Sequence, residues 1–102
     1  MSDTLADMAS KCQRITKMYQ AEFGIEPEQG WHMLKLTEEL GELTAAHLEL
    51  SGQGRRKGKS DEELKANLAE EAADVLGFLL AYCAEQGIDP EQALADKWFK
   101  YL

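Results

Sequence analysis

Two short acidic patterns in this chain place carboxylates where they could bind a metal ion. Glu39 is followed by Glu42, and Glu71 by Asp74, each pair inside a leucine-rich stretch with helical spacing. Two side chains three positions apart on an α-helix point to one side, about 60° from each other. A single helical Glu is usually solvated, so what matters is where all four carboxylates lie relative to the apolar stripes of their helices.

The apolar stripes predict that the two acidic pairs meet. We place Leu36 at zero on the helical wheel of the first stretch and Leu68 at zero on that of the second. The first carboxylate of each pair then lies at about −60° around the helix axis, and the second at about −120°. The expected stripes are Leu36, Leu40, Leu43, His47 and Leu50, and Leu64, Leu68, Ala72, Val75, Leu79 and Tyr82. Two such helices packed antiparallel would gather four carboxylates at the edge of an apolar core, where their repulsion requires protonation or a cation. Because oxygen ligands favour hard divalent ions, we expect Mg²⁺, with Mn²⁺ as a substitute.

The chain is strongly acidic, with 19 acidic and 11 basic residues and a formal net charge of −8. This balance argues against a nucleic-acid surface built on general positive charge. The chain has no run of about 20 apolar residues that would cross a membrane, and no apolar signal segment follows Met1. We therefore expect a cytoplasmic protein that binds neither nucleic acid nor a membrane.

Four of the 11 basic residues lie in one glycine-rich segment, 51–60, which separates the two acidic patterns. Its cations are Arg55, Arg56, Lys57 and Lys59. Such a segment is either a solvated turn or a mobile clamp for phosphates, since Arg and Lys are the usual phosphate partners in proteins. The carboxylate cluster expected nearby favours the clamp.

The apolar spacing predicts an all-α chain, without the alternating pattern typical of strands. Ser2 or Asp3 can cap the first helix, and Pro27 can open the second. A capping box that begins at Ser60 and an Asp-Pro pair that begins at Asp89 mark the other two helix starts. The four helices are expected over residues 3–23, 27–50, 60–86 and 89–102.

Residues 1–102 are expected to form a single domain, a four-helix bundle that assembles as a homodimer or homotetramer. The third helix is apolar on two sides, because Leu76 and Leu80 lie well off its main stripe. One chain of this size cannot readily cover both sides, which predicts the assembly. Cys12 and Cys83 lie on apolar helical positions and are expected to be reduced core residues.

The residues around the acidic patterns resemble a known family, the MazG-like, all-α nucleoside triphosphate pyrophosphohydrolases. The similarity covers about residues 30–102. Phosphoribosyl-ATP pyrophosphohydrolase and the dimeric dUTPases share this architecture, so the resemblance leaves the substrate open. The residues that carry it are Lys35-Leu36-x-Glu38-Glu39-x-Gly41-Glu42-Leu43, Glu70-Glu71-x-Ala73-Asp74-Val75-Leu76-Gly77, and Gly87-Ile88-Asp89-Pro90 with Lys97-Trp98 and Tyr101.

The resemblance implies hydrolysis of a nucleoside triphosphate between its α and β phosphates, giving a nucleoside monophosphate and pyrophosphate. It also implies that Mg²⁺ is held by Glu39, Glu42, Glu71 and Asp74. Glu38 is a candidate general base by similarity to some members, although the helical wheel points it away from Glu39. The candidate substrate-binding residues are Trp31 and His32, whose rings could stack on a base, and Lys35, Arg55, Arg56, Lys57, Lys97 and Tyr101.

The last residues depart from the family pattern. Many members carry an Asn and an Arg after the final helix that help to hold the phosphates, and Tyr101 stands near the position of that Asn. Either the basic segment takes over this contact or the phosphate clamp is weaker.

Two other classes of function are alternatives to the enzyme. One is a regulatory bundle that binds metal and nucleotide without catalysis. The other is a structural dimerisation bundle or an antitoxin-like partner protein, for which the basic segment would have no use. Release of pyrophosphate in the presence of Mg²⁺ distinguishes the enzyme from the regulatory bundle.

Overall fold

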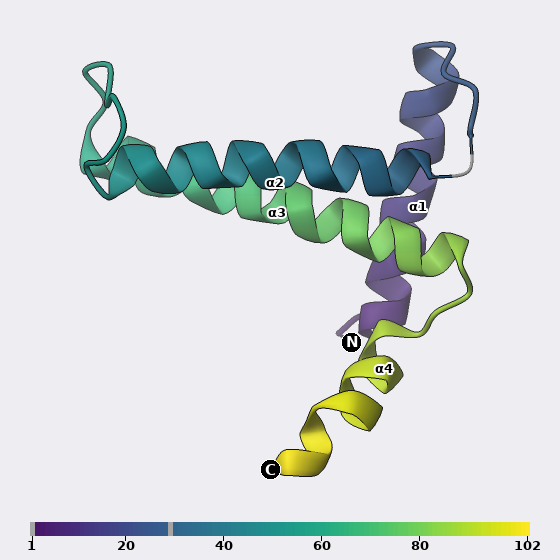
Figure 1. Ribbon diagram of the computed structural model, residues 1–102. Helices are drawn as coiled ribbons and strands as arrows, with labels where there is room; N and C mark the ends of the chain where they lie inside the picture. The colour runs from purple at the N-terminus through teal and green to yellow at the C-terminus, as the bar shows by residue number, and fades with distance from the viewer. Residues whose placement is uncertain (1, 29) are drawn as a thin grey trace.

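The computed structural model describes residues 2–28 and 30–102, and these residues form helices and connecting segments without strands. The all-α prediction is therefore confirmed for the described part of the chain (Figure 1). None of the described helices is long and apolar enough to span a membrane. The elements are α1 (Leu5–Glu22), α2 (Trp31–Leu50), α3 (Asp61–Glu85), α4 (Pro90–Lys97) and a final 3₁₀ turn (Phe99–Tyr101).

An antiparallel hairpin of α2 and α3 is the centre of the fold (Figure 1). The basic segment 51–60 joins these helices at one end, and α1 crosses them at the other end. α4 and the 3₁₀ turn project from the end of α3. This arrangement is open. The radius of gyration is 16.0 Å, whereas a compact chain of this length has a radius of about 13 Å.

Local signals account for three of the helix starts. Ser60 caps α3 in a capping box with Glu63, and Asp89 caps α4 with Pro90 in its first turn, as predicted. The cap of α1 is Thr4, in a capping box with Asp7, and not Ser2 or Asp3. A reciprocal pair satisfies two backbone N–H groups at once, which gives Thr4 the advantage.

Two helix boundaries differ from the prediction. α2 begins at Trp31 and not at Pro27, because Gly30 adopts a left-handed conformation with φ of 93° and separates the two. Within the expected start of this helix, residue 29 lies outside the described residues. The last helix ends at Lys97, where the backbone tightens into the 3₁₀ turn instead of continuing to Leu102.

The buried side of α2 is rotated away from the expected leucine stripe. The buried residues of this helix are His32, Glu39 and Ala46. Leu40, expected in the core, is 52% exposed, and His47 is exposed as well. Glu39 lies about 60° from the predicted stripe centre at Leu36. The rotation places Glu39 on the buried side of α2, while Leu36, Leu43 and Leu50 of the expected stripe stay half-buried beside it.

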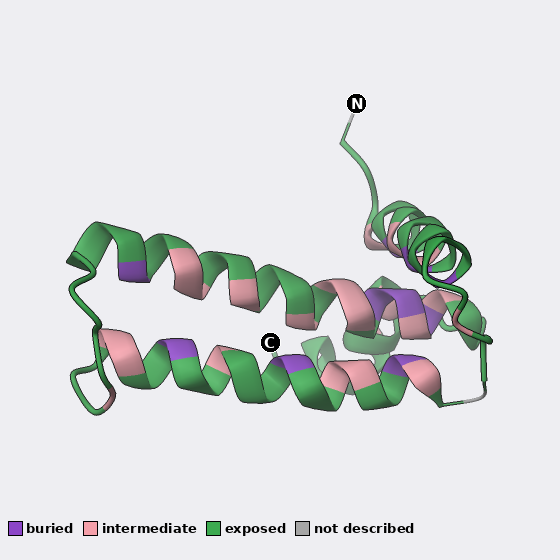
Figure 2. Cartoon of the chain, turned by 90° about the horizontal axis from the view of Figure 1, so that it is seen from above, coloured by how far each residue is buried: buried purple, intermediate pink, exposed green. Residues whose placement is uncertain are grey.

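The side of α3 that was expected to need a partner chain is covered in part by α1. Figure 2 shows α1 beside the C-terminal half of α3, where most of the buried positions gather. Leu80 is only 5% exposed, so the prediction that it lies at an interface between chains is wrong. Leu76 is 52% exposed and stays available. Cys83 is buried and Cys12 is half-buried, and both thiols are free.

Candidate metal centre

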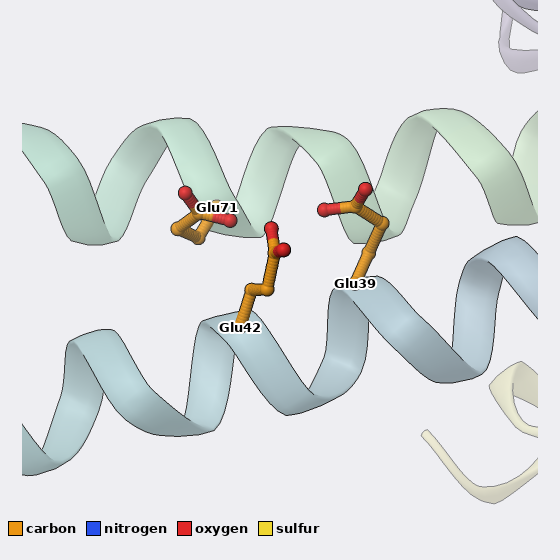
Figure 3. Close-up of side chains that lie close together, drawn as sticks. All are labelled: Glu39, Glu42 and Glu71. Carbon is orange, nitrogen blue, oxygen red and sulfur yellow. The ribbon is translucent and has the colours of Figure 1, made fainter.

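Three carboxylates meet between α2 and α3. One oxygen each from Glu39, Glu42 and Glu71 lies within 4.8 Å of the other two. Figure 3 shows Glu39 and Glu42 reaching from α2 toward α3, with Glu71 reaching back from α3. The antiparallel pairing of the helices produces this contact, because it sets the first acidic pattern opposite the second.

Asp74, the fourth predicted ligand, lies at the edge of this group. It is exposed, and its carboxylate is not among the three that come within 4.8 Å of one another. Its negative charge nevertheless helps to raise the pKa of both Glu39 and Glu71, which places it in the same electrostatic environment. The structure thus brings three of the four predicted carboxylates together and the fourth beside them.

Two carboxylates of this group, Glu39 and Glu71, have a raised pKa. Burial, followed by a hydrogen bond with Glu42 and the charges of Glu42 and Asp74, raises the pKa of Glu39 to about 7. Burial is also the first cause that raises the pKa of Glu71, ahead of the charges of Glu42 and Asp74. Each effect disfavours the negatively charged form, because burial removes solvation and neighbouring carboxylates repel the charge, and for Glu39 these effects outweigh the charge of Lys35, which lowers the pKa.

Two carboxylate oxygens of the group are suited to bind a cation. Oε2 of Glu39 and Oε2 of Glu71 are buried and have no hydrogen-bond partner among the described residues. A buried carboxylate oxygen without a partner is costly, and a hard divalent cation would satisfy several such oxygens together. The residues present therefore fit Mg²⁺ or Mn²⁺.

Lys35 is the predicted substrate-binding cation that lies closest to the carboxylates along the chain. Its Nζ donates to Oε1 of Glu38 at 2.5 Å and lies 5.7 Å from the ring centroid of Phe78. The hydrogen bond with Glu38 is the main cause that raises the pKa of Lys35, and the charge of Glu39 contributes. Glu38 itself is exposed and does not join the three clustered carboxylates, in agreement with its position on the helical wheel.

Trp31 and His32 take part in packing between helices. The Trp31 ring meets the rings of His32 and Phe78 edge-on, with centroids 5.1 Å and 5.8 Å away. His32 is buried, its Nε2 lies 3.0 Å from Oγ1 of Thr16, and burial lowers its pKa. Neither ring lies free on the surface for stacking, although His32 lines a cavity at this end of the hairpin.

The other predicted phosphate contacts lie away from the carboxylates within the chain. Arg55, Arg56 and Lys57 are in the segment that closes the hairpin beyond α2, and Arg56 donates to Asp61 at 2.5 Å. From Glu42 to the end of α2 alone the helix rises about 12 Å. Lys97 and Tyr101 belong to the C-terminal elements, which project from the opposite end of the hairpin (Figure 1).

Sequence reasoning missed the polar residues that α1 buries. The apolar spacing in residues 3–23 predicts a stripe of Leu5, Met8, Cys12, Ile15 and Tyr19 for this helix, but its buried residues are Ala9, Thr16 and Gln20. Ile15 is 63% exposed. Apolar spacing could not find this face because two of its three members are polar. The three buried residues, at positions 9, 16 and 20, are spaced seven and four positions apart, as residues on one face of a helix are. This spacing was the signal that could have identified the face.

Comparison with known proteins adds a family assignment to this geometry. The model of the family described as phosphoribosyl-ATP pyrophosphohydrolase matches residues 8–96. The matched span contains both acidic patterns and the basic segment. No curated protein and no solved structure matches the chain.

Proposed function

Because the chain belongs to the phosphoribosyl-ATP pyrophosphohydrolase family, we propose that it hydrolyses a nucleotide between its α and β phosphates with the help of Mg²⁺. The observation that carries this proposal is the group of Glu39, Glu42 and Glu71, with its two buried, unpartnered oxygens. A structural bundle would be more stable without such a group. A metal-binding site for an anionic substrate needs it.

The proposed reaction forms one bond and breaks one. The oxygen of water bonds to phosphorus, the bridging P–O bond between the α and β phosphates breaks, and pyrophosphate leaves, while the water proton passes to a base. A bound divalent ion would lower the pKa of the attacking water and offset the phosphate charge. Glu39, Glu42, Glu71 and Asp74 would hold this ion.

Lys35 and Glu38 would act as a pair in this reaction. Glu38 stays the candidate general base, although its carboxylate is engaged by Nζ of Lys35 in the absence of substrate. A phosphate oxygen is a strong partner for an ammonium group. A substrate that drew Lys35 onto its phosphates would free Glu38 to accept a proton.

We also propose that the active form is a homo-oligomer, with a contact surface that differs from the one expected from sequence. The contact residues are Met33 and Leu40 in α2 and Leu76 and Leu79 in α3, each between 42% and 52% exposed. Measured around the axis of their own helix from Glu39 in α2 or from Glu71 in α3, these apolar residues lie at about +80° to +140°. Measured in the same way, Glu42 and Asp74 lie at about −60°. When two antiparallel helices face each other, residues whose angles have the same sign lie on the same side of the pair. The hairpin therefore has one apolar face and one acidic face.

A second copy of the chain suits this apolar face. The four residues carry no charge and are each 42–52% exposed, and a group of exposed apolar side chains on one face of a soluble protein often marks an interaction surface. Stacking two hairpins through these faces would form a four-helix bundle from two chains, whereas the sequence predicted four bundled helices within one chain.

A substrate panel tests the proposed activity. Purified protein is incubated with Mg²⁺ and each of the (d)NTPs or phosphoribosyl-ATP, and pyrophosphate is measured. We expect release from at least one nucleotide, lowered at least about 100-fold by Glu71→Gln, because the variant loses a metal ligand. Glu62→Gln, an exposed residue in the first turn of α3, is the control. Nucleotide binding without pyrophosphate release would favour the regulatory bundle instead.

A further inference from the structure

The end of the hairpin opposite the basic segment contains a cavity that the proposed chemistry does not use. Its volume is about 620 Å³, and it lies between the C-terminal half of α1, the segment before α2, and the end of α3. This volume falls in the range of small-molecule sites, about 300–1,000 Å³. The residues that the argument uses are Lys17, Gln20, Glu28, His32, Tyr82 and Glu85, all of which line it.

Resting on the proposed function, we infer that this cavity binds the base and sugar of the nucleotide substrate. The substrate would then lie along α2, with its nucleoside toward the helix start and its pyrophosphate toward the basic segment. His32 precedes Glu39 by two helical turns, a rise of about 10.5 Å, which suits a nucleoside attached to a phosphate at the carboxylates.

A row of side chains runs from Lys35, one helical turn before Glu39, to the cavity. Lys35 Nζ lies over the Phe78 ring, the Phe78 ring packs against Trp31, and Trp31 packs against His32, which lines the cavity. The row begins with a cation suited to phosphate, and its rings pack against one another up to His32, which lines the cavity. This order matches the chemical order of a nucleotide.

The charges around the cavity favour a neutral group over an anion. Glu28 and Glu85 line it against the single cation Lys17. Two carboxylates would repel a phosphate, but they can accept hydrogen bonds from sugar hydroxyls or base amino groups. The cavity therefore suits the uncharged nucleoside end of the substrate and not its triphosphate.

Buried polar groups give the cavity the means to read a base edge. Gln20 is only 6% exposed and lines the cavity, and no hydrogen bond of its amide is found among the described residues. An amide offers both a donor and an acceptor, as base edges do. Thr16 Oγ1 lies in donor geometry to the carbonyl of Gln13, and in the tautomer that fits this hydrogen bond Nε2 of His32 donates to Oγ1 of Thr16. His32 Nδ1 is then an acceptor in the neutral ring.

The test separates nucleoside recognition from turnover. Binding of nucleoside monophosphates is measured by calorimetry in EDTA, and inhibition of pyrophosphate release by inorganic tripolyphosphate is measured with Mg²⁺. Gln20→Leu should weaken the binding of the nucleoside monophosphate that wild type binds most tightly by about tenfold. This is the effect of losing one hydrogen bond and leaving a polar group of the base without a partner. The inhibition constant of tripolyphosphate, which has no base, should not change.

Two further variants keep this test decisive. Glu28→Gln changes an exposed residue that lines the cavity, so its effect cannot be attributed to failed folding, and it should also alter monophosphate binding. Gln92→Leu makes the same chemical change as Gln20→Leu at an exposed position of α4, and it should alter neither monophosphate binding nor inhibition by tripolyphosphate.

Unchanged monophosphate binding in both cavity variants, or an equal loss for tripolyphosphate, would overturn the inference. Absence of pyrophosphate release in wild type would overturn the proposed function, while monophosphate binding would still decide the inference.

Discussion

Glu39 of α2 and Glu71 of α3 approach each other across the hairpin, with carboxylate oxygens within 4.8 Å, and each keeps one buried oxygen without a partner among the described residues. Two carboxylates at this distance repel one another when both are ionised. The contact is therefore unfavourable in the metal-free protein at neutral pH and favourable once a cation lies between them.

The first prediction is that divalent cations stabilise the fold. Millimolar Mg²⁺ or Mn²⁺ should raise the Tm at pH 8, because a ligand at 100 times its Kd adds about 2.7 kcal/mol to the free energy of unfolding. Thermal denaturation followed by circular dichroism measures the shift. Glu39→Gln and Glu71→Gln should show little or none of it. A Tm that stays constant across the wild-type titration would argue against the metal centre.

The second prediction concerns pH in the absence of metal. The pKa of Glu39 is raised from its usual 4.5 to about 7 in the folded protein, so the folded state binds this proton more tightly than the unfolded state. Its contribution to the free energy of unfolding is complete below pH 4.5 and is lost as the pH rises from there to about 7. Urea unfolding in EDTA at pH 5.5 and pH 8 measures this loss.

Glu39→Gln is the control for the pH dependence, since the amide cannot titrate. The variant should lose less stability than wild type between pH 5.5 and pH 8. It should also be more stable than wild type at pH 8 without metal, because the repulsion with Glu42 is removed. Equal losses in the two proteins would show that Glu39 is not the group responsible.

The third prediction concerns the basic segment. If Arg55, Arg56 and Lys57 contact the part of the substrate that becomes pyrophosphate, replacing all three with Ala should weaken triphosphate binding and leave monophosphate binding nearly unchanged. Each charge-assisted contact is worth about 1.5–3 kcal/mol when well formed, and less in an exposed segment. Calorimetry with Mg²⁺ on both ligands measures the difference. Equal effects on the two ligands would identify the segment as a solvated turn.

The fourth prediction concerns assembly. Leu76→Glu should dissociate the proposed homo-oligomer, because it places a charge in the centre of the apolar face. Leu80→Ala should lower the free energy of unfolding by about 2–5 kcal/mol without dissociation, since Leu80 is buried within the chain. Sedimentation equilibrium and urea unfolding separate the two effects. A stable wild-type monomer at micromolar concentration would contradict the proposal.

The sequence by itself determined those features that depend on neighbours a few positions apart. The capping box of Ser60 and Glu63 and the cap of Asp89 begin helices where they were expected. The spacing of Glu39 from Glu42 put both side chains on one side of α2, where the structure finds them together. Such features follow from backbone hydrogen bonds and helical period, which a short stretch of chain contains in full.

Only the tertiary structure decided how each helix is rotated about its axis. Leucines mark a face that must be covered, but they do not tell whether a helix of the same chain or another copy covers it. Leu80 is buried within the chain while Leu40 is not, and Glu39 takes the inner position that the leucine stripe predicted for Leu40. The contact of Thr16 with His32 could not be predicted either, because it joins two helices and no short stretch of sequence specifies how these helices cross. Rotation and crossing depend on the sum of many weak contacts between distant residues, so they appear only when the helices pack together.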